Sequence, residues 1–343
     1  MSVTGALYRK YRPQAFAEVR DQDHIVTVLE GAIKKGEIPH AILFSGTRGT
    51  GKTTLARIFA KAIGTADLDI YEIDAASNRG IDDVRELKEA VHTMPYESKQ
   101  KVYIIDEVHM LTKEAFNALL KTLEEPPEHV VFILATTEEE KLLDTILSRC
   151  QVFRMHSPSR AVLVDIVTDV AKQEGFTLSP DAADLIAMAA DGSFRDALGV
   201  TQKVIMASGD KIGGADEVAA IIGAPKTATM LSLLDALHKK DKEVALSAIQ
   251  DVVAANVDMK LFTRLLLEHV RAVMLLRNLP SHKDSILSSF GTEAKVKIEE
   301  YSSGATPINS HLLLRLLQAS DMMTRSPLPH VALEIAIIDA MSN

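Results

Sequence analysis

Gly46-Thr47-Arg48-Gly49-Thr50-Gly51-Lys52-Thr53 is the stretch from which the fold class of this chain follows. It matches G-x-x-x-x-G-K-[ST], a glycine-rich loop whose backbone N–H groups surround phosphates. An apolar run at residues 41–44 precedes it, and a helix-like segment at residues 54–61 follows. A strand, a glycine loop and a helix N-terminus in this order direct N–H groups and the positive end of a helix dipole at an anion. The stretch therefore predicts a nucleotide phosphate site.

Each residue of the loop has an expected task. We expect Lys52 to reach the β- and γ-phosphates, and the Thr53 hydroxyl to ligate Mg²⁺. The rest of the phosphate contacts should come from Gly46, Thr47, Arg48, Gly49, Thr50, Gly51 and Thr54. Glycine loops of this pattern also occur by chance in unrelated proteins, so the interpretation depends on a second motif downstream.

Residues 101–107, Lys-Val-Tyr-Ile-Ile-Asp-Glu, supply that second motif. A β-branched run of this kind predicts a buried strand, and it delivers two carboxylates at its carboxyl end, the edge where open α/β sheets bind ligands. We expect Asp106 to be a direct or indirect partner of Mg²⁺, and Glu107 to be the base that orients an attacking water. Together the two motifs predict a chain that binds ATP with Mg²⁺ and hydrolyses it.

Composition limits the classes of protein that this chain can belong to. Its 343 residues suggest two or three domains, and a hydrophobic content of 47% is sufficient for packed cores. A single cysteine, Cys150, excludes an internal disulfide and a cysteine-rich zinc site within one chain. We see no run of eighteen apolar residues and no apolar segment typical of a secretion signal, so a cytoplasmic protein without a membrane partner is expected. The net charge of −9 argues against general coating of nucleic acid, but not against one local DNA-binding patch.

The periodicity of apolar residues changes along the chain and predicts three domains. Up to residue 159, strand-like and helix-like segments alternate, which predicts an α/β domain with a parallel sheet flanked by helices. Residues 160–222 then show helical periodicity and predict a small helical lid, and residues 223–343 predict an all-α domain whose wide apolar stripes form a bundle core. The predicted strands lie at residues 42–44, 69–73, 102–105, 130–135 and 152–155.

Three further residues have both a functional and a structural interpretation. Thr137, after the fourth predicted strand, is placed to contact the γ-phosphate or the lytic water, but a Thr pair also forms turns. Arg149 lies too far along the chain to reach its own γ-phosphate, so it is either an arginine finger for a neighbouring subunit or an ordinary surface residue. Arg195 opens a helix, where the dipole disfavours a cation; this conflict suggests contact with the ATP phosphates, although Ser193 and Asp196 fit simple capping.

Two basic or polar segments keep alternative interpretations open. Residues 8–13, Tyr-Arg-Lys-Tyr-Arg-Pro, suit either nucleic-acid contact or a clamp beside adenine. Residues 77–80, Ser-Asn-Arg-Gly, precede a predicted helix and suit either contact with DNA phosphates or a capped glycine turn.

Taken in order, these motifs resemble the AAA+ ATPase class, and within it the gamma/tau family of clamp-loader subunits from bacterial DNA polymerase III. The similarity covers residues 1 to about 210 and is carried by residues 7–13, 43–53, 73–78, 102–111, 116–129, 145–150 and 195–198. The resemblance implies that Lys52, Thr53, Asp106 and Glu107 serve the ATP site. It further implies that Thr137 is sensor 1, Arg195 is sensor 2, and Arg149 is the trans finger, with Leu7, Tyr11 and Arg12 near the adenine.

The resemblance also implies partners, and the chain differs from typical members of the family in one segment. It implies a hetero-pentamer-like assembly with other clamp-loader subunits, in which ATP binding and hydrolysis drive loading of a sliding clamp onto primer–template DNA. Typical members carry a four-cysteine zinc module after the P-loop helix, whereas here residues 62–67 lead directly into a predicted strand, so no zinc is expected. The alternatives are a clamp-loader scaffold subunit that does not hydrolyse ATP, or another DNA-acting AAA+ machine such as a branch-migration motor.

Overall fold

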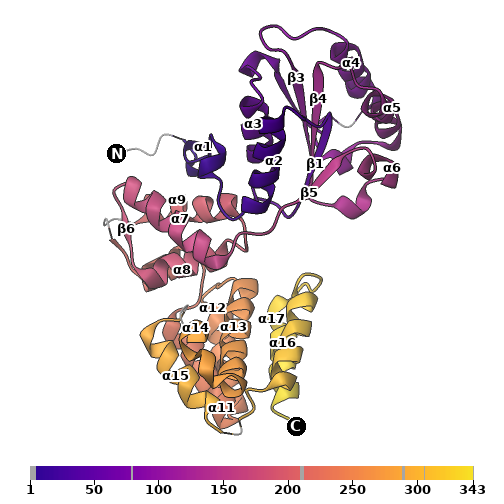
Figure 1. Cartoon of the computed structure of the whole chain (residues 1–343). Helices are drawn as coiled ribbons and strands as arrows, with labels where there is room; N and C mark the ends of the chain where they lie inside the picture. Colours follow the sequence, from indigo (N-terminus) through magenta and orange to yellow (C-terminus); the bar gives the residue numbers. More distant parts are fainter. Residues whose placement is uncertain (1–4, 79, 209–211, 288–289, 305, 343) are drawn as a thin grey trace. The chain divides into compact units, whose positions relative to one another are not determined.

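A computed structural model of the chain describes residues 5–78, 80–208, 212–287, 290–304 and 306–342 (Figure 1). The chain divides into two compact units. One comprises Met1–Ile166 together with Ala190–Gly199, and the other comprises Val167–Ala189 together with Val200–Asn343. Each unit has its own hydrophobic core and is described by itself.

The first unit is built on a five-stranded parallel sheet. Its strands are ordered β2-β3-β4-β1-β5. They span β1(Ala41–Ser45), β2(Ile70–Asp74), β3(Lys101–Asp106), β4(Val130–Thr136) and β5(Gln151–Arg154). All five predicted strands are confirmed, with ends that differ by at most one residue. Because β4 lies between β1 and β3, the carboxyl ends of these three strands meet at one edge of the sheet.

Helices cover both faces of this sheet (Figure 1). Successive strand residues point to opposite faces. Ile42 and Phe44 therefore pack against Leu55 and Phe59 of one helical layer, whereas Leu43 packs in the core of the opposite layer. The first layer contains α2(Asp23–Lys35) and α3(Lys52–Ala62), and the second contains α4(Ile81–Val91), α5(Lys113–Glu124) and α6(Asp144–Leu147). These layers cover β1, β3 and β4 on both faces, below the loops that follow the strands.

Local signals explain where the elements of the first unit end. Helix α5 begins after Thr112, whose hydroxyl accepts the N–H of Ala115, and it ends just before Pro126 and Pro127, as the sequence predicts. Short elements fill the connections: α1(Leu7–Lys10), η1(Phe16–Glu18), η2(Asp67–Asp69), η3(Val108–Met110) and η4(Glu139–Lys141).

The described part of the second unit consists of helices, their connections and one small strand pair. β6(Thr177–Leu178) and β7(Ile212–Gly213) form a parallel pair that the sequence analysis did not predict. Helices α7(Arg160–Gln173) and α9(Phe194–Ala207) contain residues of both units. The other elements are α8(Pro180–Ala189), α10(Ala215–Ile222), α11(Thr227–Lys239), α12(Lys242–Ala254), α13(Met259–Asn278), η5(Pro280–His282), α14(Lys283–Leu287), α15(Thr292–Ser302), α16(Ser310–Met323) and α17(Pro329–Ala340).

The apolar stripes of the second unit form a bundle core, as predicted. Leu234, Leu237, Phe262, Leu266 and Val270 are all buried within one cluster. Among the residues described, no single helix has the length and apolar content needed to cross a bilayer, although α10 and α11, which meet at an angle of 89°, pass that test as a pair.

Candidate nucleotide-binding site

The glycine-rich loop connects β1 to α3, whose first residue is Lys52. Two of its glycines are required by geometry. Gly49 has a φ of +78°, and a Cβ added there would lie 1.9 Å from Ser193 Oγ. A Cβ at Gly46 would lie 2.8 Å from the carbonyl oxygen of Met155. A side chain at Gly49 would displace the Ser193 side chain, and one at Gly46 would displace the Met155 backbone.

Lys52 is folded into the centre of this loop. Its Nζ donates hydrogen bonds to the carbonyl oxygens of Gly46 and Thr47, at 2.8 and 2.9 Å. Burial lowers the pKa of the Lys52 ammonium, and the nearby carboxylates of Glu107 and Asp106 oppose this shift. The two carbonyl oxygens are neutral acceptors. A phosphate oxygen is charged and accepts a stronger hydrogen bond, so the Lys52 ammonium can exchange the carbonyls for a phosphate.

Thr53 and Asp106 provide a pair of oxygens that fits Mg²⁺. The Thr53 hydroxyl donates to Asp106 Oδ2 at 2.6 Å, so the residues contributed by α3 and by β3 meet at the loop. Mg²⁺ prefers hard oxygen ligands and is usually bound through one or two protein groups, waters and substrate phosphates. A hydroxyl and a carboxylate in contact beside a phosphate loop match that donor set.

Glu107 follows Asp106 in a strained backbone conformation. Its φ of 49° and ψ of 44° lie in the left-handed region, which a non-glycine residue rarely adopts. The Glu107 Oε2 accepts hydrogen bonds from the Thr137 hydroxyl at 2.9 Å and from the Thr137 N–H at 3.3 Å. The carboxylate is therefore aimed at the end of β4, beside the loop.

The two threonines at the carboxyl end of β4, Thr136 and Thr137, have different contacts. Thr136 Oγ1 accepts the N–H of Glu138 at 3.0 Å and so forms the turn. Thr137 faces Glu107 instead. Of the two interpretations left open for this pair, the turn-forming contact belongs to Thr136, whereas Thr137 lies against the candidate base.

The start of α9 lies against the phosphate loop. The Phe194 N–H donates to the carbonyl oxygen of Gly49 at 3.0 Å. Ser193 Oγ accepts the N–H of Asp196 at 3.1 Å, which confirms the predicted helix cap. The Arg195 guanidinium stands 4.9 Å from the centroid of the Tyr8 ring. Hydrogen bonding by Arg195, and then by Arg9, lowers the pKa of the Tyr8 hydroxyl.

The N-terminal segment reaches helix α3 through Arg12. Its Nε donates to Thr54 Oγ1 at 2.9 Å, and burial lowers the pKa of this guanidinium. Tyr11 is half-buried, whereas Leu7 is fully buried in the unit. The structure thus brings Arg12 to the first turn of α3, while Leu7 contributes to the core.

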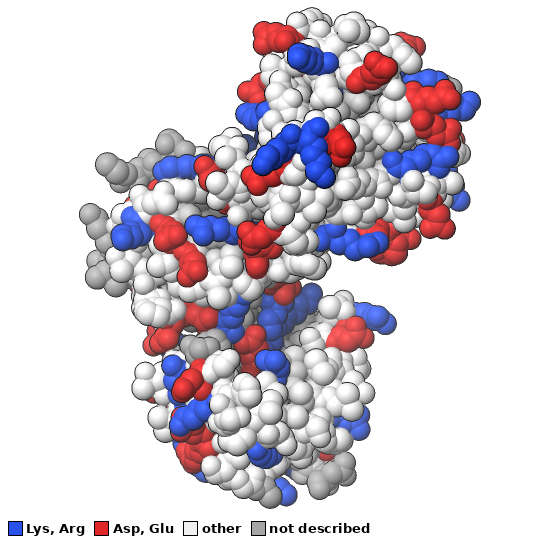
Figure 2. All heavy atoms as spheres, viewed as in Figure 1, with Lys and Arg blue, Asp and Glu red and all other residues white. Residues whose placement is uncertain are grey.

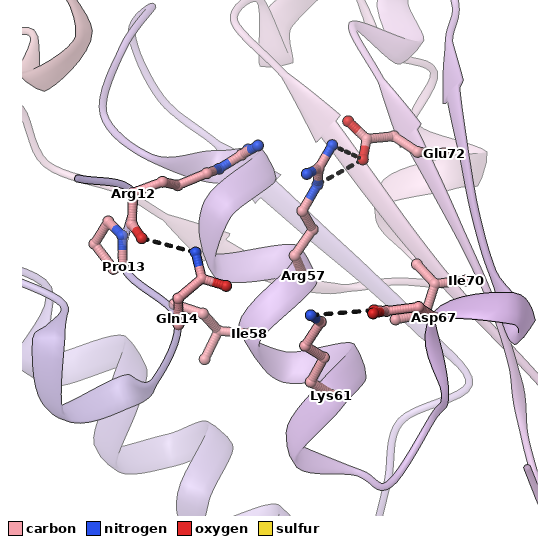
Figure 3. Close-up of a pocket in the computed structure, with 9 residues that line it drawn as sticks. All are labelled: Arg12, Pro13, Gln14, Arg57, Ile58, Lys61, Asp67, Ile70 and Glu72. Atoms are coloured by element: carbon pink, nitrogen blue, oxygen red, sulfur yellow. Dashed lines mark hydrogen bonds and ion pairs between the residues drawn. The ribbon is translucent and has the colours of Figure 1, made fainter. Parts of the chain in front are cut away.

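A pocket of about 210 Å³ is lined by residues 12–14, by one side of α3 and by residues of β2 and the turn before it (Figure 3). Two cations that line it already have carboxylate partners. Arg57 pairs with Glu72, and Lys61 pairs with Asp67 at 3.1 Å. The pocket therefore differs from the phosphate loop, where Lys52 is held by carbonyl oxygens rather than by a carboxylate.

Arg149 is separate from the phosphate loop of its own chain. Its guanidinium contacts Glu124 and donates to the carbonyl oxygen of Thr145 at 2.7 Å. About a third of the side chain, 31%, is exposed.

The neighbouring Cys150 is half-buried, and burial raises the pKa of its thiol to about 11. A thiol of that pKa stays protonated near neutral pH, which fits a packing residue.

Residues 77–80 begin with a turn built on Asp74. The Asp74 carboxylate accepts the N–H of Ala76 and the hydroxyl of Ser77, both at 2.8 Å. Arg79, the cation of this stretch, lies outside the described residues. On the face shown in Figure 2, basic and acidic side chains are interspersed over the first unit.

One residue with contacts in the site was missed by the sequence analysis. His109 lies two residues after Glu107, and its side chain is 4% exposed. Its Nδ1 is 2.9 Å from Thr136 Oγ1, and its Nε2 is 3.1 Å from Glu138 Oε1. A histidine two residues after the acidic pair was the available signal, but its partners lie at the end of β4 and in the turn that follows.

Family models match most of the chain. Residues 64–159 match "DNA polymerase III, delta subunit", and residues 163–210 match "DNA polymerase III clamp loader subunit, ATPase lid domain". Residues 214–343 match "DNA polymerase III subunits gamma and tau domain III".

Curated relatives are similar over most of the chain. DNA polymerase III subunit tau of Bacillus subtilis is 38% identical over 316 residues, which cover 86% of this chain and 55% of that protein. Subunit tau of Escherichia coli is 41% identical over 273 residues, which cover 74% of this chain and 42% of that protein. The chain thus spans about half the length of the curated relatives it matches.

Solved structures share the fold. The Holliday junction branch migration motor RuvB of Thermotoga maritima has a TM-score of 0.53 at 20% identity, covering 83% of this chain and 87% of that one. A point mutant of the same motor has a TM-score of 0.54 at 20% identity, and the match covers 73% of this chain and 86% of that one. Likeness at this level of identity identifies the AAA+ fold alone.

Proposed function

Because the chain belongs to the gamma/tau family of DNA polymerase III clamp-loader subunits, we propose that it binds and hydrolyses ATP to drive loading of a sliding clamp onto primer–template DNA. One observation carries the proposal: Lys52, the Thr53–Asp106 pair and the Glu107–Thr137 pair meet where β1, β3 and β4 end. A scaffold subunit that does not hydrolyse ATP would not need this complete set.

The residues divide the chemistry among them. The loop N–H groups and Lys52 bind the phosphates, and Thr53 and Asp106 would hold Mg²⁺, which would supply positive charge to the phosphate oxygens. Glu107 orients the attacking water and accepts its proton. Since Thr137 already donates to Glu107, the arriving γ-phosphate competes for this hydroxyl and frees the carboxylate for the water. Arg195 exchanges its contact with the Tyr8 ring for the γ-phosphate.

We further propose that the chain works within an assembly. Arg149, which contacts residues of its own surface rather than its own loop, acts on the ATP of a neighbouring subunit. Residues 1–159, 160–222 and 223–343 act as nucleotide-binding domain, lid and oligomerising collar. The partners are other clamp-loader subunits in a hetero-pentamer-like complex, the sliding clamp and primer–template DNA, in the cytoplasm.

Replacing Lys52 with Ala tests the phosphate site. Hydrogen bonds to charged groups contribute about 1.5–3 kcal/mol, so we expect ATP affinity to fall by about tenfold to a hundredfold. Clamp loading should be lost with it. Titration with a fluorescent ATP analogue measures the affinity, and Lys61→Ala, on the same helix, is the matched control. Affinity within about twofold of the parent would refute the assignment of the loop.

Zinc is not expected to be part of this protein. Only one cysteine is present in the sequence, and no group of three or more His, Cys, Asp or Glu suited to a metal occurs among the residues that the structure describes. We therefore expect elemental analysis of the purified chain to find much less than one zinc per chain. One equivalent that survives dialysis against a chelator would contradict this.

A further inference from the structure

His109 is a buried histidine at the edge of the sheet where β1, β3 and β4 end, and it connects the segments that follow β3 and β4. It lies in η3, two residues after the residue proposed as the base, and its side chain is 4% exposed. Its Nδ1 lies 2.9 Å from Thr136 Oγ1 and 3.5 Å from Glu107 Oε2. Its Nε2 lies 3.1 Å from Glu138 Oε1. One imidazole therefore contacts the loop after β3 and the turn after β4.

The partners of His109 determine how its ring is held. The Glu138 carboxylate only accepts hydrogen bonds, so it assigns a proton to Nε2. Thr136 Oγ1, which accepts the N–H of Glu138, lies 2.9 Å from Nδ1, and its hydroxyl can donate to this nitrogen or accept from it. Both ring nitrogens are thus satisfied by the turn after β4. A second contact fixes Glu138 itself, because Lys141 Nζ lies 2.5 Å from its other oxygen.

Glu107 needs such support because its backbone is strained. Its left-handed conformation is one that the surrounding structure must impose on a non-glycine residue. Within the loop, the Met110 N–H donates to the carbonyl oxygen of Glu107 at 2.8 Å. The His109 ring, anchored on Thr136 and Glu138, ties this loop to β4. The same β4 end carries Thr137, which holds the Glu107 carboxylate.

We propose that His109 is a positioning residue for hydrolysis. By clamping the loop after β3 to the end of β4, it keeps the Glu107 carboxylate and Thr137 at the spacing that the attacking water requires. Its polar contacts within the described part of the chain lie on this edge, and not on the phosphate loop or the Thr53–Asp106 pair. The inference rests on the proposed ATPase function, and it adds a residue that acts through Glu107.

His109→Ala in the assembled complex tests this, with clamp and primed DNA present. A displacement of about 1 Å in a catalytic group can lower a rate about a hundredfold, so we expect kcat to fall by roughly ten- to a hundredfold. ATP affinity should change by less than about twofold, because Lys52 and Thr53 are untouched. His109→Gln, whose amide reaches toward Glu138, should restore part of kcat. His92→Ala, an exposed histidine of the same unit, should leave kcat unchanged.

The double variant Glu107→Gln with His109→Ala separates positioning from a general structural role. If His109 acts through Glu107, its loss should lower the single-turnover rate of Glu107→Gln by less than about twofold. Three results would each overturn the inference. One is a further ten- to hundredfold fall in the single-turnover rate of the double variant relative to Glu107→Gln. The others are a kcat near the parental value in His109→Ala and a fall in its ATP affinity.

Two results keep the outcome clear. If His109→Ala does not fold, Glu138→Ala, which removes the partner of Nε2, carries the same comparison, and an unchanged kcat in that variant would refute the clamp. If Glu107→Gln alone retains parental turnover, the assignment of the base fails, which is distinct from failure of His109.

Discussion

Glu107→Gln should bind ATP as tightly as the parent and hydrolyse it about 10²- to 10⁴-fold more slowly, the range that general-base groups contribute. Glutamine fills nearly the same volume and can still contact Thr137, but its amide cannot accept a proton from water. The left-handed backbone at this position should be retained, because the surrounding structure that imposes it is unchanged. The substitution should therefore lower the rate of hydrolysis without changing the affinity for ATP.

The measurement pairs ATP titration with steady-state turnover in the assembled complex. Glu128→Gln, an exposed glutamate of the same unit, is the matched control and should behave as the parent. With hydrolysis blocked, the complex should also remain on the clamp for longer. Turnover within about twofold of the parent, with ATP bound, would mean that another residue positions the water.

Arg149→Ala should leave ATP binding by its own subunit intact and lower hydrolysis at the neighbouring site by a factor on the order of 10³, the lower end for arginine fingers. In its own chain Arg149 is paired with Glu124 at the surface. A surface ion pair contributes only about 0–1 kcal/mol, so exchanging Glu124 for a phosphate faces no large cost. Arg149→Lys should not restore the full rate, because an ammonium lacks the planar fork of a guanidinium.

Mixing two inactive chains tests the trans role directly. Arg149→Ala retains its phosphate loop, and Lys52→Ala retains its finger, so a mixed assembly contains interfaces where an intact finger meets an intact loop. ATPase activity should appear in the mixture and be absent from either variant alone. Arg20→Ala, an exposed arginine of the same unit, serves as the control for lost charge. No recovery, with both chains folded and proven to assemble together, would return Arg149 to an ordinary surface residue.

Several elements could be read from the sequence because their signals are local. The glycine spacing at residues 46–51, the β-branched run before Asp106 and the proline stop after α5 each depend on neighbours within a few residues. The five strands and the cap at Ser193 followed from such patterns. The pair β6 and β7 did not, because two-residue strands are too short to show a period of two.

The groups available for phosphate chemistry follow from the amino-acid order alone: the loop with Lys52 and Thr53, and the carboxylates of Asp106 and Glu107. Which side chains meet depends on how the strands are arranged. The strand order places β4 between β1 and β3, and this brings Thr137 to Glu107 and Thr136 to His109. Periodicity reports which face of an element is buried, but the order of strands depends on packing between segments far apart in the chain, and no local pattern encodes it.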